Sequence, residues 1–486
     1  MVYGYWSGGK LKKKEAAQWN EPASFFFNLY PTTALTMKYF NPDIETLPLD
    51  KLRQLQNERL QKLVAHLYER VPFYKKQWEE AGVRPADIKS VQDLPRLPFT
   101  QKHHLRENYP FDLFAMPVKD TIRLHASSGT TGKPTVVGYS RKDIDTFSEV
   151  VARSLVASGC QPGMKLQNAY GYGLFTGGLG MHYGGELLGM TVIPVSGGMT
   201  ERQLLLLQDF RPEVICCTPS YAQRLSEELA ARGISPESLQ VHTAILGAEP
   251  WTEGIRTQVE AGMGVRAVNI YGLSEIIGPG VSNEDFEERG TGSYIWEDHF
   301  FPEVVDKDTG EPLPEGAYGV LVFTTLTKEA MPLMRYWTND ITNIYYEHSK
   351  KRTHIKMGPI RGRSDDMLII RGVNLFPTQV EEVIQDFDQL LPSYQLIVSR
   401  EGAMASLAVK VEVKEAVLKA LGRPNLGQKT EVLPDALRNL HGALAKKIKD
   451  SIGLTMAISL VEPGSIPRSE GGKLNRVVDL RKSKKD

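Results

Sequence analysis

Residues 125–135, with the sequence HASSGTTGKPT, gather small hydroxyl side chains, two glycines and a lysine into one short stretch. Backbone N–H groups, hydroxyls and an ammonium are donors with which proteins surround phosphate oxygens. The stretch departs from the phosphate loop that opens a helix, because Ser127 stands where that pattern needs a glycine and Pro134 follows Lys133. Proline has no N–H and favours extended geometry in the residue before it, so we expect a loop between two strands. Its candidate phosphate-binding residues are Ser128, Gly129, Thr130, Thr131, Gly132 and Lys133.

Such a loop, taken alone, is also typical of an ordinary surface turn, so its function depends on partners elsewhere in the chain. Residues 271–275, YGLSE, follow an apolar run and place a ring and a carboxylate at the end of an expected strand. The Tyr271 ring can stack on a nucleotide base, and the Glu275 carboxylate can hold Mg²⁺ against phosphate oxygens. In residues 336–340, YWTND, the Asp340 carboxylate suits the two hydroxyls of a ribose.

Two further stretches carry cations. Arg363 lies at the start of GRSDDMLIIRG, where the texture of the chain changes. Near the end of the chain, Lys473 follows two glycines within residues 467–476, PRSEGGKLNR. Glycine gives a backbone conformational freedom, so this loop can present a lysine to a site and withdraw it again. Together with the preceding motifs, these residues predict nucleotide chemistry assisted by a mobile cation.

Length, charge and cysteine content narrow the class of protein. The chain has 486 residues, more than one compact core holds, so we expect at least two domains. Lysine plus arginine and aspartate plus glutamate both number 58, and this zero net charge argues against nucleic-acid binding as the main role. The three cysteines fit neither a zinc site nor a disulfide framework, and they favour a reducing, cytoplasmic location. The apolar run 25–32 is too short and interrupted for a membrane span or a signal peptide.

The order of apolar runs predicts an α/β fold with a mainly parallel sheet. Strand-like runs alternate with helix-like patterns. The strand-like runs are 191–195, 214–217, 244–247, 267–271 and 320–324, and the helix-like patterns include 201–208 and 222–230. This alternation is typical of parallel strands covered by helices, with ligands beyond the carboxyl ends of the strands. Ahead of it, Asp50 is the expected N-cap of an amphipathic helix that carries leucines at helical spacing.

The pattern of expected strands and helices changes near residue 362, and this change predicts a domain boundary. We expect a large N-terminal domain, residues 1–362, that binds nucleotide and acid. Residues 363–486 form a small, mobile C-terminal α+β lid domain that carries Lys473. Its expected elements are a hairpin from residue 395 to residue 413 and a helix around residues 437–448.

These motifs, in this order, resemble the adenylate-forming superfamily of acyl-CoA synthetases and ligases over nearly the whole chain after about residue 40. Within that superfamily the phenylacetate–CoA ligases are the most similar, on residues 169–178 (AYGYGLFTGG), 247–251 (GAEPW) and 295–300 (IWEDHF). The resemblance implies ATP, Mg²⁺ and coenzyme A as substrates and cofactors, and an aromatic acid as the second substrate. It implies neither a nucleic acid nor a membrane as a partner, and it is compatible with a homodimer.

The resemblance also assigns roles to individual residues. Glu275 would hold Mg²⁺ and act in catalysis with the mobile Lys473, and Asp365 is the hinge position. Besides the phosphate loop, the implied ATP-contacting residues are Ala248, Glu249, Pro250, Asn269, Tyr271, Gly272, Ser274, Asp340 and Arg363. Trp337 departs from the family pattern, in which an arginine is expected, and this departure puts the local packing in question. The N-terminal forty residues receive no role.

Tyr170, Phe175 and Gly247 are the candidate residues of an acid pocket. Glycines beside the two aromatic side chains leave room for a flat ring, which favours an aryl acid over a long acyl chain. We therefore expect a ligase that forms phenylacetyl-adenylate from ATP and then the CoA thioester, with release of pyrophosphate and AMP. The alternatives are a CoA ligase for indoleacetate, hydroxyphenylacetate or a benzoate, and a non-catalytic module that senses nucleotides. Glu275 and Lys473 together speak against the sensing module.

Overall fold

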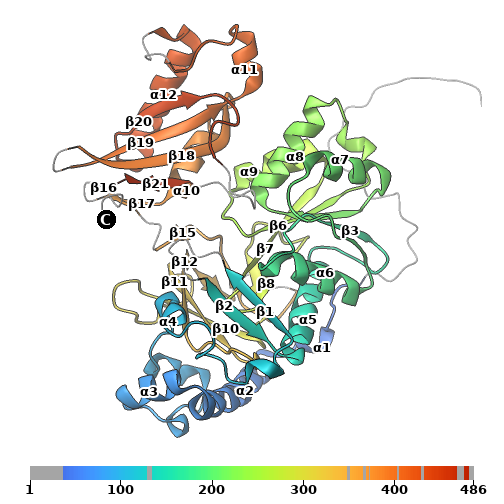
Figure 1. Ribbon diagram of the computed structural model, residues 1–486, viewed down its shortest axis with the longest axis vertical. Coiled ribbons are helices and arrows are strands. Elements are labelled where there is room, and N and C mark those ends of the chain that lie inside the picture. The colour runs from blue at the N-terminus through green and yellow to red at the C-terminus, as the bar shows by residue number, and fades with distance from the viewer. Residues whose placement is uncertain are drawn as a thin grey trace, which may run out of the picture. The chain divides into compact units, whose positions relative to one another are not determined.

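The computed structural model describes residues 37–127, 134–346, 351–364, 368–370, 373–401, 404–427, 432–467 and 476–480. The larger of the chain's two units spans Lys38–Asp486. Figure 1 labels the elements of the larger unit on the ribbon, which is coloured by residue number. None of the helices in the described ranges combines the length and the apolar character that a membrane crossing needs.

A nine-stranded sheet has the order β13-β14-β9-β8-β7-β6-β5-β3-β4. Its strands are β3 (Lys165–Asn168), β4 (Thr191–Ile193), β5 (Val214–Cys217), β6 (Thr243–Gly247), β7 (Arg266–Leu273), β8 (Gly278–Glu284), β9 (Ser293–Ile295), β13 (Ile344–Tyr345) and β14 (Lys356–Met357). The run β4-β3-β5-β6-β7 is parallel, and the pairs beyond β7 are antiparallel. The predicted α/β fold is confirmed, and the antiparallel arm is an addition that the apolar runs did not indicate.

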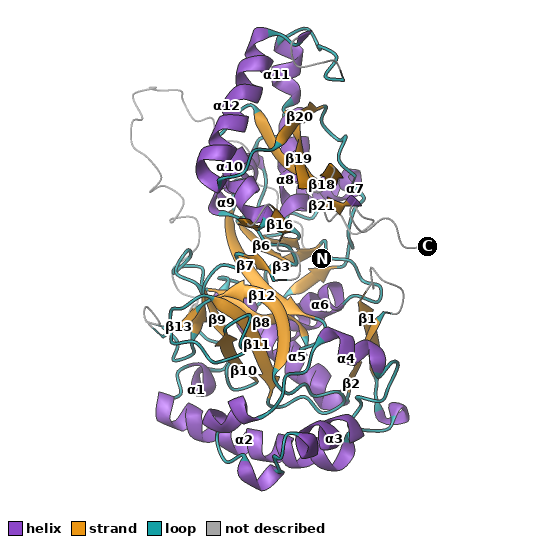
Figure 2. Ribbon diagram, turned by 90° about the vertical axis from the view of Figure 1, so that its left-hand side faces the viewer, coloured by secondary structure: helices purple, strands orange, loops and turns teal. Residues whose placement is uncertain are grey.

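Helices cover both faces of this sheet. They are α5 (Arg141–Ala157), α6 (Thr176–Leu188), α7 (Thr200–Asp209), α8 (Pro219–Ala231) and α9 (Glu253–Met263). Apolar residues of α7, α8 and α9 form one core with buried residues of β5, β6 and β7. Helices α5 and α6 pack on each other and lie against β8 (Figure 2). The alternation of strands and helices along this part of the chain therefore produces the layered arrangement expected from it.

Two smaller sheets flank the large one in sequence. Strands β10 (Phe300–Val305), β11 (Gly319–Thr325), β12 (Tyr336–Thr342) and β15 (Gly362–Arg363) form an antiparallel sheet in that order. Strands β1 (Arg123–Ser127) and β2 (Thr135–Tyr139) form an antiparallel pair in which Ser127 lies opposite Thr135. The two strands predicted around the glycine-rich stretch are thus present.

The N-terminal part of the larger unit is helical. Its helices are α1 (Pro42–Glu45), α2 (Leu49–Arg70), α3 (Pro72–Glu80) and α4 (Lys102–Glu107), with 3₁₀ turns at Pro85–Asp87, Val91–Arg96 and Val118–Asp120, and a further one later at Pro236–Ser238. The predicted leucines of α2 are largely buried. The predicted N-cap is wrong, because Pro48 precedes the helix and Asp50 lies in its first turn. A carboxylate there still favours the helix, since it faces the positive end of the helix dipole.

The C-terminal segment builds its own α+β core. Strands β20 (Ala457–Val461), β19 (Met404–Val413), β18 (Leu390–Glu401) and β21 (Val477–Asp479) form a four-stranded sheet in that order, and β16 (Leu368–Ile370) pairs with β17 (Val373–Leu375). Its helices are α10 (Pro377–Gln385), α11 (Glu415–Ala420) and α12 (Asp435–Ile452). Strands β18 and β19 are the predicted hairpin, and α12 contains the predicted helix. Buried residues of α10, α12 and the sheet share one core.

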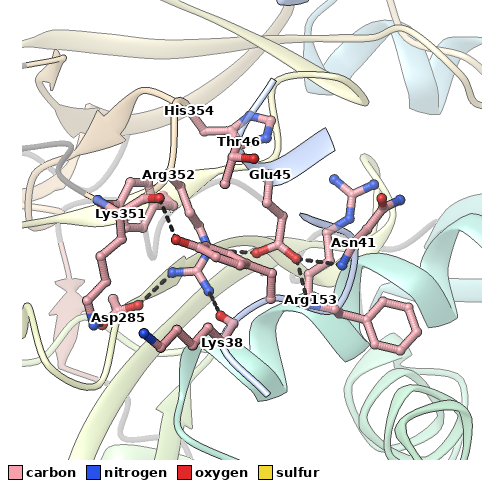
Figure 3. Close-up of polar contacts among 12 residues, drawn as sticks. Lys38, Asn41, Glu45, Thr46, Arg153, Asp285, Lys351, Arg352 and His354 are labelled. Atoms are coloured by element: carbon pink, nitrogen blue, oxygen red, sulfur yellow. Dashed lines mark hydrogen bonds and ion pairs between the residues drawn. The ribbon is translucent and has the colours of Figure 1, made fainter. Parts of the chain in front are cut away.

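A buried cluster of charges fixes the first described segment. Arg352 Nε donates to Glu45 Oε2 at 2.7 Å, and Nη1 donates to Asp285 Oδ2 at 2.6 Å (Figure 3). The Nη2 group donates to the main-chain oxygen of Lys38 at 3.1 Å. Glu45 in turn accepts the N–H of Asn41 at 2.8 Å. The cluster therefore ties α1 to the loop after β8 and to the segment before β14.

Candidate active site

Three predicted segments lie at the carboxyl ends of the parallel strands. The stretch 169–175 follows β3, the stretch 248–251 follows β6, and Ser274 and Glu275 follow β7. In a parallel sheet these ends share one edge, which is where α/β proteins bind ligands. Hydrogen bonds join the stretches: Thr176 Oγ1 and Ser274 Oγ lie 3.1 Å apart. The topology therefore brings together segments that are far apart in the sequence.

Glu275 lies just beyond β7 and is buried, with 6% of its surface exposed. Lys328 Nζ donates to its main-chain oxygen at 3.0 Å. Lys102 Nζ, from α4, lies 3.9 Å from its Oε1 atom. Burial, and to a smaller extent the neighbouring Glu275 carboxylate, raises the pKa of Tyr336 well above its usual value. The Tyr336 hydroxyl therefore keeps its proton. The carboxylate is therefore surrounded by two ammonium groups and a neutral phenol.

Tyr271, Asp340 and Arg363 meet in one hydrogen-bonded group. The Tyr271 hydroxyl donates to Asp340 Oδ2 at 2.6 Å, and Arg363 Nη1 donates to Asp340 Oδ1 at 3.3 Å. The pairing of β12 with β15 places Asp340 directly opposite Arg363. Burial, and to a smaller extent the Asp340 carboxylate, raises the pKa of Tyr271 well above its usual value. The Tyr271 hydroxyl therefore remains a donor. Three residues predicted separately from the sequence thus form one polar group.

The stretch that follows β6 is tightly constrained. A side chain at Gly247 would bring Cβ within 2.2 Å of the Ile270 main-chain oxygen, so only glycine fits this strand end. Ala248 has a left-handed backbone with φ of 71°. Glu249 Oε1 accepts from Ser220 Oγ at 3.0 Å and Oε2 from Ser220 N at 3.2 Å. Pro250 follows. The carboxylate of Glu249 is therefore engaged at the start of α8.

Asn269 of β7 is held by the same stretch. The Trp251 indole Nε1 donates to Asn269 Oδ1 at 2.9 Å. The Arg256 guanidinium lies 4.7 Å from the centre of the Trp251 ring. Gly272, two residues before Ser274, allows the close approach of β8, because a Cβ there would lie 1.8 Å from the Gly278 main-chain oxygen.

The aromatic–glycine stretch lines a cavity. Tyr170 and Phe175, two of the three predicted acid-pocket residues, contribute to its wall, and Gly247 is not among its lining residues. Tyr170 is buried, whereas Phe175 is 48% exposed. Between residues 169 and 227 the cavity is also lined by Ala169, Gly171, Tyr172, Gly173, Ser196, Gly197, Gly198, Thr218, Tyr221, Arg224 and Glu227. The wall thus combines aromatic rings and small residues with the polar side chains of Thr218, Arg224 and Glu227.

The strand before the glycine-rich stretch contacts this wall. Ala126 N donates to the Leu174 main-chain oxygen at 3.1 Å, and His125 Nδ1 lies 2.9 Å from the same oxygen. Burial lowers the pKa of His125, which favours the neutral ring. Strand β1, which precedes the glycine-rich stretch in the sequence, therefore lies beside the cavity-lining segment. Ser128, Gly129, Thr130, Thr131, Gly132 and Lys133 themselves, with Asp365 and Lys473, lie outside the described residues.

Lys102 and Lys328 were not predicted from the sequence. Each is a single lysine in a segment distant from Glu275, and neither belongs to a pattern that indicates a site. The position of Lys328, shortly after the buried strand β11, is the one available signal. Burial lowers the pKa of Lys328 to about 8, against the opposing effect of the Asp143 and Glu275 carboxylates.

The residues around Glu275 fit Mg²⁺ only as a metal carried with phosphate. Among the described residues no group of three or more metal-ligating side chains occurs. Mg²⁺ is commonly bound through one or two carboxylates together with substrate phosphates and waters. A single buried carboxylate at the strand edge, as Glu275 provides, meets this requirement.

Family models match most of the chain. The model of the AMP-binding enzymes matches residues 43–327, and the model of the AMP-binding enzyme C-terminal domain matches residues 372–481. The phenylacetate–coenzyme A ligase of Thermus thermophilus is 62% identical over 444 residues, which are 91% of this chain and the whole of that protein. The corresponding ligase of Escherichia coli is 50% identical over 439 residues, 90% of this chain and 97% of that protein.

Solved structures agree with these relatives. A 2-hydroxyisobutyryl-CoA ligase in the postadenylation state, in complex with R3-HIB-AMP, has a TM-score of 0.84 at 26% identity and covers 96% of this chain and 97% of that one. The same ligase in complex with 2-HIB-AMP and CoA, in the thioesterification state, has a TM-score of 0.67 at 28% identity and covers 95% and 96% of the two chains.

Proposed function

Because the chain belongs to the family of AMP-binding enzymes, we infer that it is an AMP-forming phenylacetate–CoA ligase. The observation that carries this inference is the 62% identity to the Thermus ligase over the whole length of that protein. The reaction has two halves. The acid carboxylate attacks the α-phosphate of ATP and releases pyrophosphate, and the CoA thiol then attacks the acyl carbon and releases AMP.

The cavity wall supports an aryl acid as the substrate. Tyr170 and Phe175 supply aromatic surface, and the glycines between them leave a flat space. Aromatic pairs in favourable geometry contribute about 0.5–1.5 kcal/mol beyond area burial. We propose that Tyr170, Phe175 and Gly247 select phenylacetate over alkyl acids of similar size.

The nucleotide is assigned to the strand edge. Asp340, held by Tyr271 and Arg363, presents a carboxylate for the two ribose hydroxyls. The stretch 248–250 and Asn269 flank the adenine. The glycine-rich stretch 128–133, with Gly272 and Ser274, surrounds the phosphates. Hydrogen bonds hold Asp340, Asn269 and Glu249 in the chain without a ligand, which lowers the entropic cost of orienting the nucleotide.

Glu275 is the proposed magnesium ligand. When bound, Mg²⁺ would neutralise charge on the phosphate oxygens during attack by the acid carboxylate. The residues of this chain bring positive charge to the same place, because Lys102 lies 3.9 Å from the Glu275 carboxylate. Concentrated positive charge is what the approach of two anions needs.

Lys473 is the proposed mobile catalytic residue, and Asp365 the proposed hinge between domains 1–362 and 363–486. During adenylation the Lys473 ammonium bridges the acid carboxylate and the α-phosphate. Thioester formation needs that position vacated for the CoA arm. The related 2-hydroxyisobutyryl-CoA ligase has been solved in a postadenylation state and in a thioesterification state. The existence of two such states supports a rotation of the lid domain. We also propose a homodimer and a cytoplasmic location.

The test measures both half-reactions on one purified protein. With phenylacetate, ATP and Mg²⁺ the chain should release pyrophosphate, and CoA should then give phenylacetyl-CoA by mass detection. Indoleacetate, hydroxyphenylacetate, benzoate and 2-hydroxyisobutyrate should be used less efficiently. Absence of acid-dependent pyrophosphate release with every acid would refute the proposal, and faster turnover of another acid would replace phenylacetate as the substrate.

Lys473→Ala separates the half-reactions. Loss of a preorganised charge typically costs about 10²–10³-fold in the step it serves. The variant should lose pyrophosphate release to this degree, yet convert supplied phenylacetyl-adenylate and CoA at close to the normal rate. Equal loss of both half-reactions would show that Lys473 acts on folding instead.

A further inference from the structure

Lys328 is a buried lysine whose position the reaction outlined above does not explain. It follows β11 by three residues and is 4% exposed. Its ammonium donates at 3.0 Å to the main-chain oxygen of Glu275 and lies 5.1 Å from the centre of the Tyr139 ring. Burial of an ammonium group is costly, and a hydrogen bond to one carbonyl offsets that cost only in part. A buried charge in such surroundings therefore has a use other than stability.

The turn that carries Lys328 is anchored to helix α5. Asp143 Oδ1 accepts the N–H of Glu329 at 2.7 Å, and its Oδ2 accepts the N–H of Ala330 at 2.9 Å. The same carboxylate accepts the N–H of Ser140, which caps the helix. The Lys328 backbone is thus connected through Asp143 to the first turn of a buried helix, and its ammonium is held in a fixed place.

A second contact holds the main chain on the other side of Glu275. The Tyr139 hydroxyl donates to the Ile277 main-chain oxygen at 2.9 Å. Burial raises the pKa of Tyr139 well above its usual value, so this hydroxyl remains a donor. The turn after β7 is therefore held at two main-chain carbonyl groups. Lys328 binds the carbonyl of Glu275, and Tyr139 binds the carbonyl of Ile277.

We propose that Lys328 is a positioning residue for adenylation, which fixes the main chain of Glu275 and so aims its carboxylate at the metal-bound phosphates. The proposal rests on the proposed function, since it assumes that Glu275 serves the ATP-bound metal. A hydrogen bond from an ionised donor is about twice as strong as a neutral one, which suits a contact that must hold a loop in place. Residues that orient a metal ligand typically change metal affinity or activity by about 10–100-fold when they are altered.

The test is Lys328→Met, which keeps the length of the side chain and removes its charge and donor. Acid-dependent pyrophosphate release should fall about 10–100-fold, and the Mg²⁺ concentration for half-maximal rate should rise. Conversion of supplied phenylacetyl-adenylate and CoA should stay within about twofold, because that step is not served by the metal. The matched control is Lys142→Met, which removes an exposed lysine bonded to Glu329 at 3.0 Å and should leave both half-reactions unchanged.

A second variant covers the case in which Lys328→Met does not fold. Lys328→Gln retains a neutral donor and should show the same rise in the Mg²⁺ requirement at a smaller magnitude, whereas Lys328→Arg should restore it in part. If the unmodified chain releases no pyrophosphate, the proposed function fails. If the unmodified chain is active and the folded Gln variant keeps the normal Mg²⁺ requirement, or loses both half-reactions equally, the positioning role of Lys328 is overturned.

Discussion

Two regions of the molecule hold charged groups in different ways. In the cluster around Arg352, the guanidinium is 1% exposed and its bonds to Glu45 and Asp285 measure 2.7 and 2.6 Å. At the candidate active site, Arg363 is 32% exposed and lies 3.3 Å from Asp340, and Lys102 lies 3.9 Å from Glu275. The first region is closed and its pairs are tight. The second is partly open and its pairs are long.

The difference separates stability from binding. A fully buried guanidinium with a partner on each side has no remaining donor to offer a ligand, and the removal of one partner leaves an uncompensated charge. A carboxylate with loose, partly solvated partners can exchange them for ligand groups at little cost. Mutations in the two regions should therefore have opposite effects on the free energy of unfolding and on catalysis.

The largest effect on stability is expected for Arg352→Met. The variant leaves the buried Glu45 carboxylate with main-chain donors alone and Asp285 with Lys351 as its remaining cation. Removal of one partner from such a buried pair typically costs about 3–5 kcal/mol. Urea-induced unfolding should show this loss, while the KM for ATP of the protein that remains folded should be unchanged. Lys307→Met is the control, because Lys307 and Asp308 form an exposed pair worth less than about 1 kcal/mol. A loss as small as that of the control would contradict the closed character of the cluster.

The reverse pattern is expected for Asp340→Asn. This substitution removes the charge that accepts from Tyr271 and Arg363 and that is proposed to accept from the ribose. Hydrogen bonds to charged groups contribute about 1.5–3 kcal/mol, so the KM for ATP should rise about 10–100-fold. The free energy of unfolding should change much less. Asp308→Asn, on an exposed carboxylate, is the matched control, and an unaltered KM for ATP in Asp340→Asn would remove this residue from the nucleotide site.

The sequence predicted the strands and motifs at the edge of the sheet better than the lysines that surround Glu275 there. Strands β5, β6 and β7 follow from apolar runs, because a buried parallel strand needs apolar side chains on both faces. Tyr271, Glu275 and Asp340 follow from short local motifs. Lys102 and Lys328 reach Glu275 from distant segments, and a lone lysine has no periodicity that reveals its burial.

The same limit applies to the closed cluster. Glu45, Asp285 and Arg352 are ordinary charged residues in the sequence, and only the fold brings them within hydrogen-bond distance. Asp50 failed as the N-cap for a related reason. Pro48 is the residue before the helix and takes the N-cap position. This local effect outweighed the preference of aspartate for that position.

A third prediction concerns pH and belongs to the closed side of the comparison. His354 is fully buried, its Nδ1 accepts the N–H of Glu297 at 3.1 Å, and burial lowers its pKa to about 4. The unfolded chain binds this proton near pH 6.5, so stability is complete above that pH and falls as the pH drops towards 4. At pH 5 the loss relative to pH 7 amounts to about 2 kcal/mol.

His354→Gln keeps an acceptor for the Glu297 N–H and removes the titration. Burial also lowers the pKa values of His104, His125 and His242, which act in the same direction, so only the difference between the two proteins isolates His354. Urea unfolding of both proteins at pH 7 and pH 5 provides that difference. Parallel pH profiles would mean that the folded protein accommodates a charged His354.

The smallest effect is expected at Trp337, which lies in β12 three residues before Asp340. Its ring packs edge-on against Phe99 with centroids 4.9 Å apart, and its Nε1 donates to Asn339 Oδ1 at 2.9 Å. Asn339 also receives the N–H of Ser364 at its main-chain oxygen, at 2.7 Å. Trp337 therefore supports Asn339, the residue of β12 next to Asp340 that has a left-handed backbone.

Trp337→Arg introduces the residue that the family pattern leads one to expect. Loss of the aromatic pair costs about 0.5–1.5 kcal/mol. The guanidinium can donate to Asn339 in place of the indole and regain about 0.5–1 kcal/mol over the Phe99 ring, so the net change in stability should stay below about 1 kcal/mol. Urea unfolding and the KM for ATP measure the two consequences. If the KM for ATP changes as much as in Asp340→Asn, then Trp337 belongs with the open, ligand-binding region, because a purely packing role cannot alter nucleotide affinity to that extent while stability is retained.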